Sequence, residues 1–323
     1  MDSIDIAVVI SVKDDPRVVE CVDAVLAQTA PFPFEVVVVD NGSRDDTPRL
    51  LSSRFQTNPS VKLLAQRGHL SEAWNTAAQT TTVSILVRID ADARPLPGWL
   101  DALTRPIREG TADWTAGPVG GANVDVSIVA RYYHERTEAY NRRLARDADL
   151  RDAVPSWNVA YRRSALERAG WYDPWQASSV DWDLHKRLAR TGARGQFVKE
   201  ARCVHYHPTR LWDLARKEAW YRTGQYQMAL KYGFLEMASG FSLPLAYGLL
   251  LALAIAALAL TPLAWMALLL LVALLLKHWV EGVRESDPMW FYRALFRPVE
   301  GFAGLYGLVR GLVRYGVRRP VPP

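Results

Sequence analysis

Two aspartates follow an apolar run in the segment ILVRIDADARP, which covers residues 85–95. Asp90 and Asp92 stand two positions apart, so in extended backbone both carboxylates lean toward the same side. Carboxylates held close together repel each other, and a divalent cation relieves that repulsion. Mn²⁺ and Mg²⁺ prefer oxygen ligands and are commonly shared with substrate phosphates. Such pairs are also common in turns, so the surrounding elements must decide between a metal site and a turn.

A second acidic position ends another apolar run, in the segment VVVVDNGSRDDT at residues 36–47. The ionised carboxylate of Asp40 accepts hydrogen bonds, and at a strand end it can take one from a nucleobase N–H or a ribose hydroxyl. Asp45 and Asp46 stand just before a threonine and a proline, and they suit the start of a helix better than a binding site.

Four basic or imidazole side chains are further candidates for the same site. His205 and His207 also stand two positions apart, and either could supply a third metal ligand, although a histidine on an apolar strand is as often a core residue. Arg88 and Arg94 flank the aspartate pair and could neutralise charge on a phosphate group. Solvation of a loop explains the two arginines equally well.

Asp181 stands where a helical pattern begins in the segment VDWDL. A carboxylate there can act as a general base, which removes a proton from an attacking hydroxyl group. It can also serve as the N-cap of a helix that runs to about residue 190. Both interpretations remain open from the sequence.

The elements that must position these side chains alternate between apolar runs and helical patterns over residues 4–205. Strands are predicted at residues 4–12, 34–39, 61–65 and 83–89, with helices at about 16–28, 46–55 and 70–79. This alternation predicts an α/β domain with a mostly parallel, Rossmann-like sheet. Ligands bind such sheets at the carboxyl ends of the strands, where residues 40 and 90 fall.

The combined pattern resembles glycosyltransferase family 2, the inverting enzymes of GT-A fold. The likeness rests on the opening strand, on VVVVDNGSRDDT and on IDAD, and it covers residues 4 to about 210. Further matches are Gly68 and Asn75 in QRGHLSEAWNTAA, Asn158 in WNVAYRRSALERAG, VDWDL and the strand end CVHYH.

The resemblance implies a role for each candidate residue. Asp40 would contact the base of a nucleotide diphosphate sugar, and Asp90 the ribose or the sugar. Asp92 would be the main ligand of Mn²⁺ or Mg²⁺, with Asp90 beside it and His205 or His207 as a third ligand. The other donor-binding candidates are Arg88, Arg94 and Asn158.

Asp181 also bears on the acceptor. A hydroxyl acceptor needs a base, whereas a phosphate acceptor is already an anion. The family members that extend a glycan carry an E-D pair, whereas those that load a sugar onto polyprenyl phosphate generally lack it. Here the Asp is present as Asp181, but Val180 replaces the acidic residue before it. Arg94 stands where the polyprenyl-phosphate mannose synthases have a metal-binding Gln. We therefore expect a hydroxyl of a polyprenyl-linked or other lipid-linked acceptor.

Two alternatives remain: a polyprenyl-phosphate hexose synthase, and a non-catalytic membrane protein that only binds a nucleotide sugar. By likeness to the mannose synthases, mannose from GDP-mannose is the favoured donor and UDP-glucose the next.

A membrane anchor is predicted after residue 236. Residues 237–276 contain no ionisable group except Tyr247. At 1.5 Å per residue such a helix would be about 60 Å long, twice the roughly 30 Å of a bilayer core. Pro262 interrupts the run, so we predict a hairpin with spans at 242–260 and 262–280. A buried helical pair in a soluble protein is the less favoured alternative.

The net charge of +5 is concentrated near the C-terminus. Residues 209–236 mix basic and aromatic side chains, which favours binding to anionic lipid headgroups over nucleic acid. Basic flanks predict that the catalytic domain and the tail are both cytoplasmic, and having only two cysteines fits a reducing compartment. The predicted segments are a GT-A domain at 1–208, amphipathic interfacial helices at 209–240, the transmembrane hairpin at 241–280 and a basic aromatic interfacial segment at 281–323. After residue 288 six arginines oppose Glu300 alone: Arg293, Arg297, Arg310, Arg314, Arg318 and Arg319.

Overall fold

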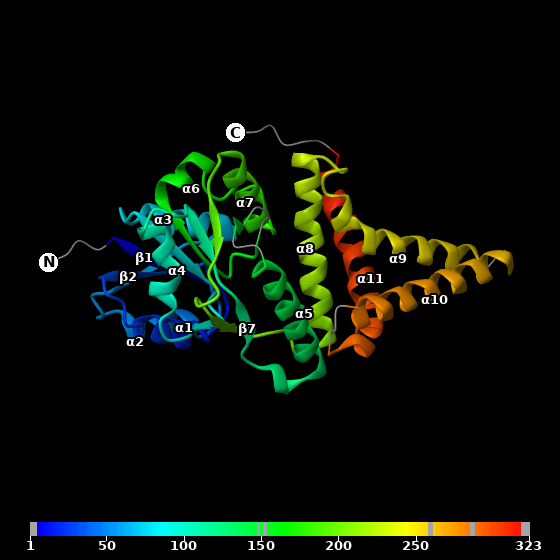
Figure 1. Cartoon of the computed structure of the whole chain (residues 1–323), viewed down its shortest axis with the longest axis horizontal. Coiled ribbons are helices and arrows are strands. Elements are labelled where there is room, and N and C mark those ends of the chain that lie inside the picture. Colours follow the sequence, from blue (N-terminus) through cyan, green and yellow to red (C-terminus); the bar gives the residue numbers. More distant parts are fainter. Residues whose placement is uncertain (1–4, 147–148, 151–153, 258–260, 285–287, 318–323) are drawn as a thin grey trace. The chain divides into compact units, whose positions relative to one another are not determined.

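The computed structural model describes residues 5–146, 149–150, 154–257, 261–284 and 288–317 (Figure 1). The chain forms two compact units. The first comprises Met1–Asn123 and Tyr140–His207, and the second comprises Val124–Ala139 and Pro208–Pro323. The first unit ends at His207, and a helical segment from its middle belongs to the second unit.

The first unit is the expected α/β domain, built on an eight-stranded sheet of order β3-β2-β1-β4-β9-β6-β10-β8. Strands β1, β2, β3 and β4 are parallel, whereas β9 runs antiparallel to β4 and to β6. The strands are β1 (Ile6–Val12), β2 (Phe34–Asp40), β3 (Val61–Ala65), β4 (Ile85–Ile89), β6 (Trp114–Ala116), β8 (Asp149–Leu150), β9 (Asn158–Arg162) and β10 (Gly195–Phe197).

Both faces of this sheet are buried, which explains why its central strands read as continuous apolar runs. Along β2, Val36 and Val38 belong to one core, while Val37 and Val39 belong to the other. Helices α1 (Val18–Leu26), α2 (Thr47–Phe55) and α4 (Trp99–Arg108) contribute to the first core. Helices α3 (Leu70–Gln79), α6 (Arg163–Ala169) and α7 (Val180–Arg190) contribute to the second.

A small second sheet crosses the carboxyl edge of the first. Its order is β5-β11-β7, with β5 at Ala93–Pro95, β7 at Val119–Gly121 and β11 at Cys203–His205. Strand β11 is antiparallel to β5, and this register sets His205 opposite Ala93. A chain segment far along the sequence is thereby placed beside Asp92.

The second unit is helical and contains α8 (Leu211–Tyr232), α9 (Ala238–Ala256), α10 (Thr261–Arg284), α11 (Trp290–Tyr315) and most of α5 (Ile128–Leu144), after the short η1 (Val124–Val126). Glycines let α11 approach α8 closely, because a Cβ atom at Gly307 would lie 2.3 Å from the Ala219 carbonyl oxygen. The segments predicted to lie at the bilayer surface therefore pack on each other through one face.

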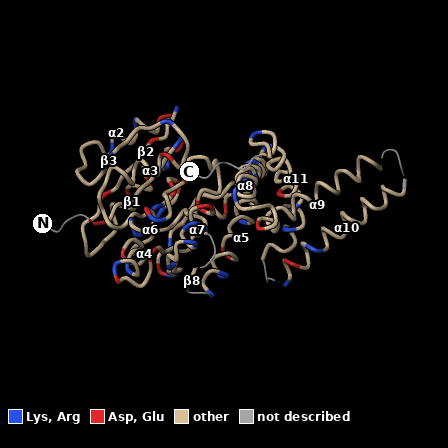
Figure 2. The backbone as a smooth tube through the Cα atoms, turned by 90° about the horizontal axis from the view of Figure 1, so that it is seen from above, with Lys and Arg blue, Asp and Glu red and all other residues tan. Residues whose placement is uncertain are grey.

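Two helices, Ala238–Ala256 and Pro262–Arg284, are long and apolar enough to cross a membrane. Only 22% and 17% of their apolar windows are buried, which argues against a pair of core helices in a soluble protein. No charged residue lies on α9, and Lys277, Glu281 and Arg284 lie near the end of α10 (Figure 2). Residues 258–260 of the predicted first span, and Arg318 and Arg319, lie outside the described residues.

Candidate active site

The carboxyl ends of β1, β2 and β4 meet at one edge of the large sheet. In the register of the sheet, Val12 at the end of β1 lies beside Asp40 at the end of β2. Asp90 and Asp92 follow β4 directly, and the backbone N–H of Tyr206 donates to the carbonyl of Asp92 at 3.2 Å. Sequence order and strand pairing together bring the acidic residues and the end of β11 to the same place.

Asp90, Asp92 and His205 form a group that could hold a metal ion. Nε2 of His205 lies 3.0 Å from Oδ1 of Asp92 and 3.9 Å from Oδ2 of Asp90. One ligand atom from each residue falls within 4.8 Å of the others. Two carboxylates and an imidazole are a donor set that suits Mn²⁺ and also accommodates Mg²⁺. The residues present therefore fit the expected cation.

Protein contacts hold the imidazole of His205 in position. His205 is 4% exposed, and its ring meets the Trp157 ring edge-on with centroids 5.3 Å apart. His207 is also buried, and its ring lies 6.0 Å from that of His205. Since only His205 joins the carboxylates within the described part of the chain, it is the stronger candidate of the two for the third ligand.

Two arginines add positive charge beside the carboxylates. Arg88 places Nη2 3.8 Å from Oδ1 of Asp90. Arg17 places Nη2 3.6 Å from Oδ2 of Asp92 and also pairs with Asp15. The sequence analysis missed Arg17, although it follows the end of β1 at the same sheet edge and could have been found by that position.

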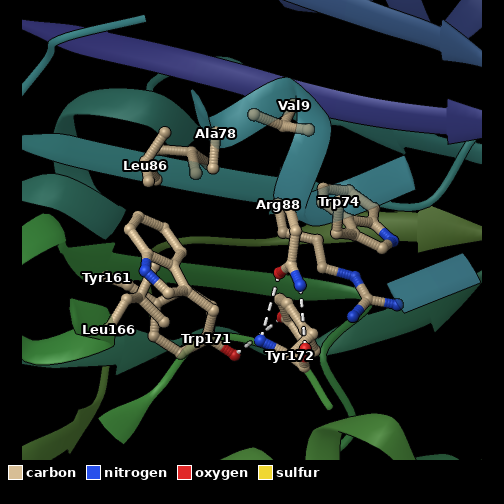
Figure 3. Close-up of a pocket in the computed structure, with 11 residues that line it drawn as sticks. Val9, Trp74, Ala78, Leu86, Arg88, Tyr161, Leu166, Trp171 and Tyr172 are labelled. Atoms are coloured by element: carbon tan, nitrogen blue, oxygen red, sulfur yellow. Dashed lines mark hydrogen bonds between the residues drawn. The ribbon is translucent and has the colours of Figure 1, made fainter. Parts of the chain in front are cut away.

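Arg88 also lines a pocket on the side of the sheet that α3 and α6 cover. Its guanidinium carbon lies 4.3 Å from the ring centroid of Trp74 and 5.2 Å from that of Tyr172. Figure 3 shows the head of Arg88 beside these two rings and directed away from Leu86 and Ala78. The rest of the lining is apolar apart from Asn75.

Asp181 lies in the first turn of α7 and does not cap it. Ser179 occupies the N-cap position, so the expectation that Asp181 itself is the N-cap is wrong. The Asp181 carboxylate accepts hydrogen bonds from the backbone N–H of Ser156 at 3.0 Å and of Trp182 at 2.9 Å. Burial raises the pKa of Asp181 above its ordinary value, even though Arg88 and these N–H groups lower it. A raised pKa suits a general base.

A buried chain of hydrogen bonds anchors α7 to the sheet. His185 accepts the Val154 N–H at Nδ1 and lies 2.8 Å from the Tyr161 hydroxyl at Nε2. The Tyr172 hydroxyl donates to that of Tyr161 at 3.4 Å. Burial lowers the pKa of His185 to about 3, so its imidazole is neutral at ordinary pH. This hydrogen-bond network could not be predicted from the sequence, because its members come from three separate segments.

The remaining candidates make contacts with residues other than the three candidate metal ligands. The Asp40 carboxylate accepts the Ser43 N–H at 3.0 Å at the end of β2. Arg94 pairs with Glu20 at 3.3 Å. Asn158 is fully buried, and its amide bonds to Trp99 and to the carbonyls of Pro118 and Ala201. These contacts give Asn158 a structural role, and its contact with the donor stays a prediction.

Two other residues of the family pattern have clear structural roles. Gly68 exchanges two hydrogen bonds of 3.1 Å with the side chain of Asn41, which joins the loop after β2 to the loop before α3. Asn75 exchanges two with the backbone of Tyr172, at 2.8 and 3.1 Å. Both contacts stabilise loops that border the site.

Comparison with known proteins agrees with this geometry. The chain is 26% identical over 229 residues to Glycosyltransferase AglE of Haloferax volcanii, a match that spans 69% of this chain and 73% of that protein. It is 29% identical over 170 residues to the pre-mycofactocin glycosyltransferase of Mycobacterium tuberculosis, covering 50% of this chain and 35% of that protein.

Two solved structures share the fold along nearly the whole chain. The mannosyltransferase PcManGT from Pyrobaculum calidifontis, in complex with GDP-Man and Mn²⁺, matches with a TM-score of 0.59 and 22% identity over 94% of this chain and 87% of that one. TarS 1-349 from S. aureus, in complex with UDP-GlcNAc, matches with a TM-score of 0.54 and 15% identity over 95% and 92%.

These likenesses confirm the predicted GT-A architecture of the α/β unit. The family profile described as Glycosyl transferase family 2 matches residues 7–170, a stretch that contains the loops after β1 and β2, the aspartate pair and β9. The chain therefore belongs to glycosyl transferase family 2.

Proposed function

We propose that the protein is a metal-dependent, inverting hexosyltransferase that uses a nucleotide diphosphate sugar as donor and a hydroxyl of a lipid-linked molecule as acceptor. The observation that carries this proposal is the convergence of Asp90, Asp92 and His205 at the carboxyl edge of the sheet. PcManGT, which shares the fold, was solved with GDP-Man and Mn²⁺, and this supports the proposed donor class and cation.

The donor would lie along the sheet edge between β2 and β4. Asp40 at the end of β2 would accept a hydrogen bond from the nucleobase, and Asp90, Asp92 and His205 would hold the cation. A bound divalent cation would neutralise charge on the diphosphate leaving group. Arg17 adds fixed positive charge beside Asp92, which favours binding of an anionic donor.

Asp181 is the proposed general base. It would take the proton from the acceptor hydroxyl as the oxygen attacks the anomeric carbon and the carbon–phosphate oxygen bond breaks. The raised pKa of its carboxyl brings it closer to the operating pH, where a base works best. A phosphate acceptor would need no such base, so direct loading of polyprenyl phosphate remains the second candidate, supported by Val180 at the position before Asp181.

A donor screen tests the proposal. The full chain in detergent with Mn²⁺ is incubated with GDP-mannose, UDP-glucose and other nucleotide sugars, and release of nucleoside diphosphate is measured. We expect release from one donor, with GDP-mannose favoured and UDP-glucose next. Thermal stabilisation by a nucleotide sugar with no release from any donor, in the presence of lipid extract, would instead identify a non-catalytic binding protein.

We further propose that α9 and α10 anchor the protein in the cell membrane, with the catalytic unit and the C-terminus on the cytoplasmic side. Their large apolar side chains are exposed along both helices, as in Leu249, Ile255, Trp265 and Leu269. Basic residues of α11 would meet anionic lipid headgroups. Single cysteines near Pro262 and near Arg314 test sidedness, because an impermeant thiol reagent added to intact cells should label only the first.

A further inference from the structure

The guanidinium group of Arg88 is buried without the hydrogen bonds that a buried cation normally makes. The residue is 6% exposed. Its Nε and Nη1 atoms make no hydrogen bond with any residue that the structure describes. Nη2 lies 3.8 Å from Asp90, which is an ion pair but too long for a hydrogen bond. Nearly all buried polar groups in folded proteins have partners. Arg88 lacks them at two nitrogens, whereas the buried Arg222 and Arg297 lack one at Nε only.

Aromatic stacking and a side-chain hydrogen bond with Tyr172 account for the charge of Arg88, but Nε and Nη1 have no partner among the described residues. Trp74 and Tyr172 lie over the guanidinium at 4.3 and 5.2 Å, and such contacts stabilise a cation. They act on the face of the group, whereas its N–H bonds point outward in the plane. Because Asn75 fixes the backbone of Tyr172 on one side, the plane of the guanidinium is held in place.

The direction of Arg88 places these N–H groups near the reaction centre. Side chains alternate between the two faces of a sheet, so along β4 and the residue after it Leu86, Arg88 and Asp90 lie on the same face. Figure 3 shows the head of Arg88 turned away from Leu86. The carboxylates of Asp90 and Asp181 both act electrostatically on it. Nη2 of the same guanidinium lies 3.8 Å from Oδ1 of Asp90, so the unpartnered Nε and Nη1 belong to a group that borders the candidate metal ligands.

We propose that Arg88 recognises the sugar of the nucleotide-sugar donor, with its Nε–H and Nη1–H groups donating hydrogen bonds to oxygen atoms of that sugar. This inference rests on the proposed function, because the donor must bind at this edge of the sheet. In that arrangement the nucleobase lies near Asp40 and the diphosphate near the cation, which leaves the sugar beside Arg88. Sugar hydroxyls, and the carboxylate of an acidic sugar, all accept hydrogen bonds. Arg88 is then a specificity-determining residue for the sugar and contributes little to binding of the nucleotide.

The test compares binding of a nucleoside diphosphate with binding of its sugar conjugate. The probes are GDP with GDP-mannose and UDP with UDP-glucose, measured by calorimetry on the full chain in detergent with Mn²⁺. In Arg88→Met we expect affinity for the sugar conjugate to fall about 10- to 100-fold, as for loss of hydrogen bonds to a charged group. Affinity for the free diphosphate should stay within about threefold, since those contacts are retained.

Equal losses for diphosphate and sugar conjugate would overturn the inference and assign Arg88 to the diphosphate, and no loss for either would overturn it as well. Failure of the wild-type chain to bind any nucleotide or nucleotide sugar would overturn the proposed function itself. In a second arm, a larger loss for UDP-glucuronate than for UDP-glucose would support carboxylate recognition, and equal losses would support recognition of hydroxyls.

Two further variants control for misfolding of Arg88→Met. Arg108 is a matched control, because it stacks on Phe32 at 4.5 Å and pairs with Asp101 on the same helix, away from the aspartate pair. Arg108→Met should leave both affinities unchanged. Arg88→Lys keeps the charge but loses the planar fork. If Arg88→Met does not fold, a tenfold or larger loss confined to the sugar conjugate in Arg88→Lys supports the inference, and unchanged affinity overturns it.

Discussion

Each unit of the chain contains a cluster of charged side chains, and the two clusters differ in how closely their opposite charges pair. In the helical unit, Arg136 of α5 pairs with Glu300 of α11 at 2.5 Å and with Glu218 of α8 at 2.8 Å. Arg297 takes the other oxygen of Glu300 at 2.9 Å, and Tyr132 donates to Glu300 at 3.2 Å. Glu300 is 1% exposed and surrounded by donors.

The electrostatics of this cluster are those of a structural element. Although burial raises the pKa of Glu218, Arg136 and Arg222 lower it below its ordinary value, so the carboxylate stays ionised. Its members come from α5, α8 and α11, and their pairing joins three helices. No external ligand is needed to explain any of these contacts.

The cluster in the α/β unit is organised for a ligand. Asp90 and Asp92 share an edge of the sheet with His205, with Nη2 of Arg17 3.6 Å from Asp92 and Nη2 of Arg88 3.8 Å from Asp90. Arg88 has two nitrogens without hydrogen bonds to described residues. Charged groups paired with each other at hydrogen-bonding distance hold a fold together, whereas a cluster of metal-ligand side chains beside an arginine with two unpartnered nitrogens indicates where a substrate or ion binds.

The largest expected effect comes from removing a candidate metal ligand, because only the cluster in the α/β unit is expected to bind a cation. Asp92→Asn should abolish glycosyl transfer, a loss of more than about 10³-fold, because the cation loses its main carboxylate ligand. The rise in melting temperature that Mn²⁺ gives the wild type should also disappear, since only a bound ion stabilises the fold. Asp101→Asn on α4 is the control and should keep both. Full activity in Asp92→Asn would remove Asp92 from the metal site.

Asp181→Asn should lower the rate with a hydroxyl acceptor by about 10²- to 10⁴-fold, because a general base is lost. The wild-type rate should fall as the pH drops through the raised pKa of Asp181, at a pH above the ordinary aspartate value of about 3.9. A pH profile of kcat/KM measures this limb, which the variant should lack. Little change in rate would favour a phosphate acceptor.

Glu300→Gln tests the structural cluster. Removing this charge leaves Arg297 buried without its carboxylate and Arg136 with Glu218 alone, and we expect a loss of about 3 kcal/mol in the free energy of unfolding. Asp125→Asn in the same unit is the control and should cost less than about 1 kcal/mol, because the pair of Asp125 with Arg131 is exposed. Thermal unfolding in detergent compares them. Stabilisation by Mn²⁺ should persist in both, and its loss in Glu300→Gln would contradict the division into two kinds of cluster.

The smallest expected effect concerns acid stability. His185 has a pKa of about 3 in the fold and about 6.5 when unfolded, so its contribution is fully present above about pH 6.5 and is lost as the pH falls toward 3. The slope is at most about 1.4 kcal/mol per pH unit. His185→Gln should show a shallower decline of melting temperature between pH 6.5 and 4.5. The exposed His69 is the control, and a His69→Gln variant should follow the wild type.

Much of the fold could be predicted from local pattern. The four central strands were expected at residues 4–12, 34–39, 61–65 and 83–89, and the structure has them at Ile6–Val12, Phe34–Asp40, Val61–Ala65 and Ile85–Ile89. Runs of β-branched residues favour strands buried on both faces. The position of Asp40 and Asp90 at strand ends followed from the same pattern, because parallel strands end at one edge.

Other parts of the site depend on contacts between distant segments. The choice of His205 over His207 follows from the register of β11 against β5, which the sequence does not specify. Arg94 pairs with Glu20 on α1, a contact between distant segments that the sequence does not specify. The alternative that Asp181 caps α7 fails because the helix begins at Val180, with Ser179 as its N-cap.

The sequence by itself determined the α/β class, the acidic strand ends and the two apolar helices, because each depends on the types and spacing of residues that are neighbours in the chain. Only the tertiary structure decided which charges are satisfied and which are not. Nothing in the sequence distinguishes Arg88 from Arg136. In the structure Arg136 meets two carboxylates at hydrogen-bonding distance, whereas Arg88 meets aromatic faces and lies 3.8 Å from Asp90. The physical reason is that desolvation and hydrogen bonding depend on every group packed around a side chain, and most of those groups come from elsewhere in the chain.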